Sequence, residues 1–135
     1  MILDGEQVEL DVEMPGEDIH HLIDASLIER ALRNLLDNAI RYGKDGHYLG
    51  IELTADDQAV NIIVKDKGKG IPLEHQEHIF ERFYRVDGGR KGEGLGIGLS
   101  IVKDISLAHQ GTLKMNSVSY VETKFQIRLP ISPPV

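Results

Sequence analysis

The sequence predicts an α/β (α+β) fold, because two kinds of hydrophobic pattern occur in one short chain. Apolar residues at strand-like spacing, bounded by turn-forming residues, predict β-strands at residues 7–13, 47–53, 60–65, 112–117 and 122–129. Apolar residues that recur every three or four positions predict helices at 26–42, 73–79 and 99–109. A chain of 135 residues is long enough to bury a core, so we predict a single domain over residues 1–135 with its core at about 6–130.

Composition excludes several classes of function. The chain has no cysteine, so disulfides, thiolate metal sites and thiol nucleophiles are all absent. Fifteen basic against 22 acidic residues give a net charge of −7, which argues against nucleic acid as a partner. No apolar run approaches the roughly 18 residues of a membrane span, and the acidic N-terminus does not resemble a signal peptide. We therefore expect a soluble domain without membrane contact.

The predicted helix at 26–42 has recognisable ends. Ser26 and Glu29 have the spacing of a capping box, in which each side chain bonds a free N–H group of the first turn. Gly43 is well placed to end the helix.

A polar stripe lies beside the apolar face of this helix. Asn34, Asn38, Arg41 and Tyr42 fall at i, i+4, i+7 and i+8, which places them on one face. One interpretation is a polar edge facing water. The other is a ligand site, in which amide oxygens bind a hard cation such as magnesium, Arg41 meets phosphate and Tyr42 packs on a base or sugar.

An acidic residue followed by two spaced glycines ends the predicted strand at 60–65. In Asp66-Lys-Gly68-Lys-Gly70-Ile71-Pro72 the glycines permit a tight backbone excursion that leaves the carboxylate accessible along it. Such a carboxylate can accept hydrogen bonds from an exocyclic amine while a ring lies against the glycines. The alternative is an ordinary Asp-Gly turn.

Three of the seven aromatic residues fall within five positions, in Phe80-Glu-Arg-Phe83-Tyr84-Arg85. On its own, this segment is interpreted as a local hydrophobic cluster that pins a loop. The charged, glycine-containing segment 86–91 that follows is predicted to be a mobile lid.

Glycine recurs at every second position in Gly92-Glu-Gly94-Leu-Gly96-Ile-Gly98-Leu-Ser100, directly before the helix predicted at 99–109. Alternating glycines weaken both strands and helices. A loop that leads into a helix N-terminus presents backbone N–H groups, which suit a phosphate. The segment is therefore either a polyphosphate-binding loop or a flexible surface turn.

Together these segments resemble the catalytic ATP-binding domain of bacterial two-component sensor histidine kinases, part of a wider group with DNA gyrase and the heat-shock chaperone ATPases. Four motifs match in the family's order: the asparagine box at 34–42, the first glycine box at 66–72, the phenylalanine box at 80–85 and the second glycine box at 92–100. The phenylalanine box points to the kinases specifically. The resemblance implies a Bergerat-type two-layer sandwich, with a mixed β-sheet and about three helices on one face.

The resemblance also implies roles for individual residues. Asn38 would ligate Mg²⁺ and, with Arg85 as a lid arginine at the terminal phosphate, act in catalysis. Asp66 would accept a hydrogen bond from the adenine amino group, beside Thr123. The full set implied to bind ATP is Asn34, Asn38, Arg41, Tyr42, Asp66, Gly68, Gly70, Ile71, Gly94, Leu95, Gly96, Gly98, Leu99 and Thr123.

The chain departs from the family pattern in places. Lys67 and Lys69 add charge inside the first glycine box, and Glu122 replaces a common glycine before Thr123. None of the six histidines is followed by an acidic residue, as the family's phosphoacceptor histidine is. The P-loop and dinucleotide-binding signatures are also missing. We therefore expect the phosphoacceptor, dimerisation and sensor domains to lie outside this chain.

Three hypotheses follow. The first is a histidine kinase catalytic domain that binds Mg-ATP and transfers the γ-phosphoryl group to a histidine on the dimerisation domain of the same kinase, which then serves a response regulator. The resemblance implies a cytoplasmic, monomeric domain of a membrane-anchored protein. The second is a stand-alone serine kinase of the anti-sigma-factor type, which the phenylalanine box disfavours. The third is a nucleotide-gated interaction module without catalysis.

Overall fold

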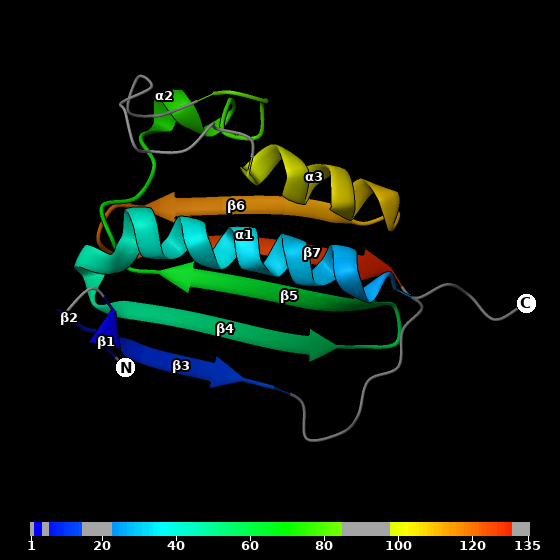
Figure 1. Cartoon of the computed structure of the whole chain (residues 1–135), viewed down its shortest axis with the longest axis horizontal. Helices are drawn as coiled ribbons and strands as arrows, with labels where there is room; N and C mark the ends of the chain where they lie inside the picture. Colours follow the sequence, from blue (N-terminus) through cyan, green and yellow to red (C-terminus); the bar gives the residue numbers. More distant parts are fainter. Residues whose placement is uncertain (1, 4–5, 15–22, 85–97, 131–135) are drawn as a thin grey trace, which may run out of the picture.

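A computed structural model describes residues 2–3, 6–14, 23–84 and 98–130 of the chain. Its elements form two layers, with one five-stranded sheet behind two long helices (Figure 1). In chain order the elements are β1 (Ile2–Leu3), β2 (Glu6–Gln7), β3 (Glu9–Glu13), α1 (Ala25–Gly43), η1 (Lys44–Gly46), β4 (Tyr48–Ala55), β5 (Ala59–Asp66), α2 (Leu73–Gln76), α3 (Gly98–Ala108), β6 (Thr112–Val118) and β7 (Glu122–Pro130).

The sheet is mixed, as predicted. Its strand order is β3-β4-β5-β7-β6, in which β3 runs parallel to β4 and the other neighbours are antiparallel. Helices α1 and α3 cover one face, whereas the four-residue α2 lies beyond β6 in Figure 1. The predicted two-layer sandwich is therefore confirmed, with its third helix shorter than the pattern at 73–79 indicated. The first predicted strand, 7–13, is divided between β2 and β3.

The core lies between the two helices and the inner face of the sheet. Leu35 of α1, Val102 of α3 and Ile127 of β7 are each at most 1% exposed. Within each element, buried residues alternate with exposed ones at the helical period of 3.6 or the strand period of 2, so each element turns one face inward. Strand β7 extends one residue beyond the strand predicted at 122–129, to Pro130, which pairs with Ala59.

The start of α1 differs from the prediction. Asp24 supplies the cap: its Oδ1 accepts hydrogen bonds from the backbone N–H groups of Ser26 and Leu27 and from the Ser26 hydroxyl. The Ser26 hydroxyl bond and these backbone bonds lower the pKa of Asp24. Glu29 pairs instead with Arg33, one turn later. The predicted capping box was wrong because the cap lies two residues earlier, at Asp24, so that Ser26 falls inside the first turn of a helix that begins at Ala25.

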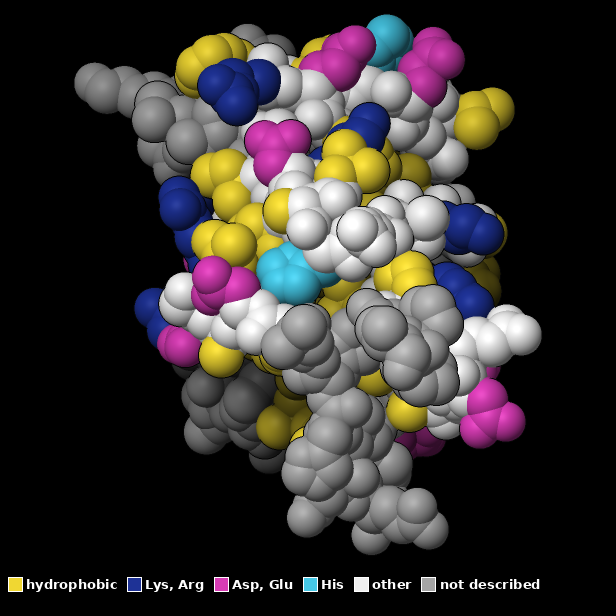
Figure 2. All heavy atoms as spheres, turned by 90° about the vertical axis from the view of Figure 1, so that its right-hand side faces the viewer, with side chains coloured by type: hydrophobic (Ala, Val, Ile, Leu, Met, Phe, Trp, Pro, Cys, Tyr) yellow, Lys and Arg dark blue, Asp and Glu magenta, His cyan; other side chains and the backbone are white. Residues whose placement is uncertain are grey.

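The capped end of α1 also meets the end of α3, where the backbone N–H of Asp24 donates to Nε2 of His109 at 3.0 Å. Figure 2 shows this end of the molecule, remote from Gly43, where charged side chains of both signs are spread among hydrophobic ones. Within the described parts of the chain, no helix is both long and apolar enough to cross a membrane.

Candidate nucleotide-binding site

Asp66 is the last residue of β5 and is buried, with 4% of its surface exposed. Its Oδ1 accepts a hydrogen bond from the backbone N–H of Gly68 at 3.0 Å. Among the described residues, its other oxygen has no hydrogen-bond partner. A buried carboxylate oxygen without a partner is costly, so the position favours a ligand that donates a hydrogen bond there.

Burial raises the pKa of Asp66 to about 6 from its ordinary value of 3.8. The Gly68 N–H bond lowers this pKa, whereas the nearby charge of Asp45 raises it further. Desolvation is the largest of these effects, because it penalises the ionised form. The carboxylate is therefore ionised and able to accept hydrogen bonds at neutral pH, and protonates in mildly acidic solution.

Two glycines let the backbone approach this carboxylate closely. A Cβ on Gly43 would lie 2.2 Å from Cγ of Asp66, and one on Gly68 would lie 2.5 Å from Cα of Gly43. Both distances are far below van der Waals contact. Gly43 was predicted to be a helix stop, and α1 does end there, but this close approach to Asp66 supplies the stronger reason for glycine.

A short polar network lies next to Asp66. Thr123 of β7 is its cross-strand partner and is 3% exposed. The Thr123 hydroxyl shares a 2.8 Å hydrogen bond with the Ser117 hydroxyl of β6, which also accepts from the backbone N–H of Ile71 at 2.9 Å. Gly70 has a φ of +78°, a conformation that L side chains rarely adopt. These hydrogen bonds therefore connect the first glycine box, through Ile71, to β6 and β7 next to Asp66.

The polar stripe of α1 lies on the side of the site towards α3. Asn34 donates through Nδ2 to the carbonyl oxygen of Gly98 at 3.3 Å, which links the asparagine box to the start of α3. Asn38 and Tyr42 are half-buried, and Arg41 is exposed. An amide oxygen at a partly exposed position suits Mg²⁺, which keeps several waters and substrate phosphates as ligands.

The two lysines of the first glycine box point to different places. Lys67 Nζ lies 4.1 Å from the centre of the Tyr48 ring on β4. Lys69 Nζ lies 6.0 Å from the ring centre of Tyr42, on the asparagine-box side. Of the two departures in this motif, Lys69 is therefore the one placed next to a predicted nucleotide-binding residue.

Several predicted residues lie outside the described residues: Arg85, Gly94, Leu95 and Gly96, together with the lid predicted at 86–91. Gly98 and Leu99 are described and form the first turn of α3. Among the described residues, a Cβ on Gly98 would meet nothing within 4 Å. Open space there is compatible with a ligand at the helix start.

The phenylalanine box is partly core and partly surface. The Phe80 and Phe125 rings pack edge to face, with their centres 6.3 Å apart. The Tyr84 hydroxyl is hydrogen-bonded to His75. Phe83 is 64% exposed and has a positive φ of 68°. The cluster therefore anchors the segment to the core through Phe80 while it exposes Phe83.

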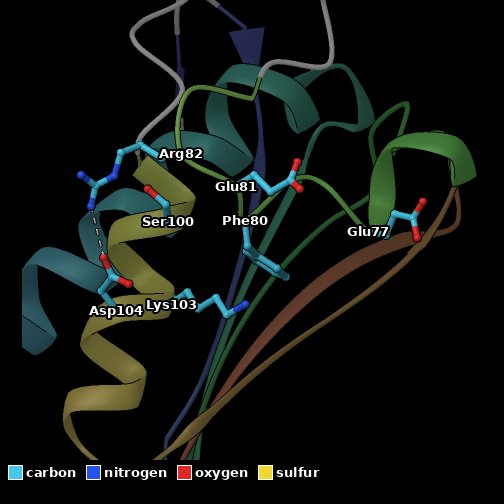
Figure 3. Close-up of a pocket in the computed structure, with 7 residues that line it drawn as sticks. All are labelled: Glu77, Phe80, Glu81, Arg82, Ser100, Lys103 and Asp104. Atoms are coloured by element: carbon cyan, nitrogen blue, oxygen red, sulfur yellow. Dashed lines mark ion pairs between the residues drawn. The ribbon is translucent and has the colours of Figure 1, made fainter.

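A hollow of about 340 Å³ lies between the phenylalanine box and α3 (Figure 3). Lys103 extends from α3 towards the side of the hollow on which Phe80 lies. At one edge of the hollow, Arg82 forms an ion pair with Asp104 at 3.8 Å. The lining residues are Glu77, Phe80, Glu81, Arg82, Ser100, Lys103 and Asp104. None of them is a predicted nucleotide-binding residue, so this hollow is separate from the site around Asp66.

Sequence reasoning missed three residues at the base of the site. Ser117 bridges Thr123 and Ile71, Asp45 acts on the pKa of Asp66, and Tyr120 bonds both Asp45 and Gly68. Ser117 is the cross-strand partner of Thr123, so antiparallel pairing of the two strands predicted at 112–117 and 122–129 would have indicated it. Asp45 and Tyr120 meet across 75 residues and leave no local signal in the sequence.

Known proteins resemble this chain in both sequence and structure. The family model described as histidine kinase-, DNA gyrase B-, and HSP90-like ATPase matches residues 23–133. Sensor histidine kinase CusS of Escherichia coli (strain K12) is 46% identical over 109 residues, which cover 79% of this chain and 22% of that protein. Sensor histidine kinase RppB of Synechocystis is 39% identical over 126 residues, which cover 92% and 28%. The chain thus spans about a quarter of the length of these curated relatives.

Solved structures agree with this assignment. The mycobacterial sensor histidine kinase MprB has a TM-score of 0.79 at 32% identity, with 94% of this chain and 86% of that chain covered. The catalytic domain of histidine kinase ThkA has a TM-score of 0.78 at 27% identity, with 93% and 82% covered. The chain belongs to the histidine kinase-, DNA gyrase B-, and HSP90-like ATPase family, and within it is a catalytic ATP-binding domain of the sensor histidine kinase type.

Proposed function

We propose that this chain binds Mg-ATP and donates the γ-phosphoryl group to a histidine on the dimerisation domain of its own kinase, in a two-component pathway that ends at a response regulator. The observation that carries the nucleotide part is Asp66: a buried carboxylate with one unpartnered oxygen among the described residues, framed by Gly43 and Gly68. An adenine amino group supplies the hydrogen-bond donor that this oxygen lacks.

Base recognition and charge neutralisation occupy two ends of the site. Asp66 accepts from the adenine amino group, and Thr123 completes the polar floor beside it. At the other end Asn38 provides an oxygen ligand for Mg²⁺, and Arg41 is exposed on the same face of α1. Mg²⁺, when bound, neutralises charge on the phosphate oxygens.

The transfer itself asks little covalent chemistry of the protein. The bond from the γ-phosphorus to the β–γ bridging oxygen breaks, an N–P bond forms on the acceptor imidazole, and ADP leaves. Positioning and electrostatic stabilisation then supply most of the rate acceleration. In this assignment Asn34 holds the start of α3 next to the asparagine box, and Arg85 from the phenylalanine box acts at the terminal phosphate.

The experiment has two stages. Calorimetry with ATP, ADP and GTP, each with and without Mg²⁺, is expected to show magnesium-dependent binding that prefers adenine nucleotides. Labelled γ-phosphate is then followed to a separately supplied, histidine-bearing dimerisation domain of the same kinase. Absence of any ATP or ADP binding by folded protein would overturn the proposal.

The second stage separates the alternatives. Phosphate that appears on the acceptor domain and resists base but not acid is a phosphohistidine and supports the proposal. Phosphate on a serine of a partner would support the serine kinase instead. Retained ATP binding without transfer to any supplied domain would favour the nucleotide-gated interaction module, with the exposed Phe83 as its contact.

A further inference from the structure

Tyr120 occupies an unusual position in the turn between β6 and β7. The turn closes with a hydrogen bond from the backbone N–H of Val121 to the carbonyl oxygen of Val118 at 2.9 Å, and Tyr120 has a φ of +57°. A bulky residue is strained in this region of conformational space, and glycine would avoid that strain. The side chain is 64% exposed, so core packing does not compensate for the strain.

Tyr120 instead contacts the first glycine box in two ways. Its backbone N–H donates to the carbonyl oxygen of Gly68 at 2.8 Å. Its hydroxyl donates to Oδ2 of Asp45, in η1, at 3.2 Å. The β6–β7 turn and the end of α1, which leads into η1, lie at the same end of the molecule (Figure 1).

The carboxylate of Asp45 lies directly over Gly68. Its Oδ1 is 2.7 Å from the position that a Cβ on Gly68 would occupy. Gly68 in turn donates its N–H to Asp66. Contacts therefore run from Tyr120 through Asp45 and Gly68 to the carboxylate that we assign to the base.

We infer that Asp45 and Tyr120 form a positioning pair that holds the first glycine box under the adenine ring and so sets the strength of base recognition by Asp66. This inference rests on the proposed function, because it assigns supporting residues to that site. In this proposal neither residue contacts the base. Both act through Gly68, whose two backbone hydrogen bonds tie it to Tyr120 and to Asp66.

The pair also has an electrostatic role that distinguishes its two members. The described groups around Asp66 include Gly43 of α1, Asp45 of η1, Leu49 of β4, Gly68, and Thr123 of β7, and Asp45 is the charged one among them. Its charge helps to raise the pKa of Asp66. Removal of that charge therefore lowers this pKa, whereas removal of the Tyr120 hydroxyl leaves the charge in place.

The test uses two substitutions and a matched control. Tyr120→Phe removes the hydroxyl bond and keeps the charge. Asp45→Asn keeps an acceptor oxygen for Tyr120 and removes the charge. Tyr48→Phe breaks another tyrosine–aspartate bond, from Tyr48 to Asp11 at 3.0 Å between β4 and β3, which does not touch Gly68. ATP affinity is measured from pH 5 to 8, and the Asp66 carboxyl is titrated by ¹³C NMR in the nucleotide-free protein.

We expect Tyr120→Phe to weaken ATP binding about 3- to 10-fold at pH 7.5, the effect of one lost hydrogen bond, with Tyr48→Phe unchanged. Asp45→Asn is expected to move the Asp66 titration, and the pH below which ATP binding falls, to lower pH, and Tyr120→Phe is not. Equal affinity in wild type and Tyr120→Phe, or an unmoved titration in Asp45→Asn, would overturn the inference. Failure of the wild type to bind ATP would instead overturn the proposed function, and the titration would still test the pair.

Discussion

The two ends of the proposed nucleotide site are built differently. The base end consists of Asp66, the first glycine box and Thr123. It contacts α1, η1, β6 and β7, and at Gly43 and Gly68 the backbone comes so close to its neighbours that a side chain would clash. The phosphate end, which consists of Asn34, Asn38 and Gly98, rests on one face of α1 and the first turn of α3. A hydrogen bond from Asn34 to Gly98 joins those two helices there.

This difference assigns a different physical task to each end. The residues of the base end contact one another without a ligand. This arrangement destabilises the folded state because the Asp66 carboxylate is desolvated, and it favours selectivity because the acceptor is preorganised. The phosphate end presents partly exposed amides. In the proposed function, its charge balance depends on the metal and the phosphates themselves. Substitutions at the base end should therefore change the fold and the selectivity, whereas those at the phosphate end should change magnesium-dependent affinity alone.

Gly43→Ala should have the largest effect, because the new Cβ would lie 2.2 Å from Cγ of Asp66. The base end must shift as a unit, which we expect to cost about 1–3 kcal/mol of stability and to remove adenine binding. Thermal unfolding and calorimetry measure the two effects. Gly98→Ala is the matched control: because no described residue lies within 4 Å of the new Cβ, it should keep the fold and weaken ATP binding only. Equal stability of the two variants would contradict this account of the base end.

Asn38→Ala should abolish magnesium-dependent nucleotide binding with the fold intact, because the side chain is only half-buried and its proposed partner is the metal. Titration with ATP in the presence of Mg²⁺ or EDTA measures the effect. We expect the residual affinity to be the same in both solutions. Unchanged affinity in Mg²⁺ would rule out the metal role of Asn38.

The same contrast explains what the sequence could predict. Hydrophobic period placed five of the strands and the two long helices to within about two residues, because their burial repeats along the chain. Asp66 and its glycines were visible as a motif because the chemistry lies in consecutive residues. The Asp24 cap was missed because the competing signal, Ser26 with Glu29, has equally good spacing two residues later.

What the sequence could not show are contacts between distant segments. Asp45 and Tyr120 are 75 residues apart, and Gly43 meets Asp66 only after α1 has packed on the sheet. Side-chain direction is equally non-local: Lys67 and Lys69 are two residues apart, yet one lies over Tyr48 and the other near Tyr42. Such facts depend on register and packing, which no local pattern carries.

Asp66→Asn should separate stability from selectivity at the base end. The folded-state pKa of about 6 lies above the ordinary 3.8, so the folded state binds more protons between these values and stability falls as pH rises through this window. Above this pH window, the ionised carboxylate lowers the free energy of unfolding by up to about 3 kcal/mol, a penalty that the neutral amide of asparagine avoids. We therefore expect Asp66→Asn to unfold at a higher temperature than wild type at pH 7.5, and to lose this advantage near pH 4.

The same variant should lose its preference for adenine over guanine nucleotides, because the amide no longer offers a charged acceptor to the amino group. Competition between ATP and GTP measures that preference. A variant that is no more stable at pH 7.5, or that keeps the wild-type preference for ATP, would contradict the role of Asp66 in one respect or the other.

Asn34→Ala should have the smallest effect, because it removes one neutral hydrogen bond of 3.3 Å to Gly98. That bond contributes about 1 kcal/mol, and alanine regains roughly half of it through higher helix propensity, so stability should change little. ATP affinity should still fall about 2- to 5-fold, since the start of α3 is no longer held beside Asn38. Arg33→Ala is the neighbouring control, because its ion pair with Glu29 is exposed on the solvent side of α1. If both variants bind ATP equally well, the asparagine box does not position α3, and the phosphate end depends on α1 alone.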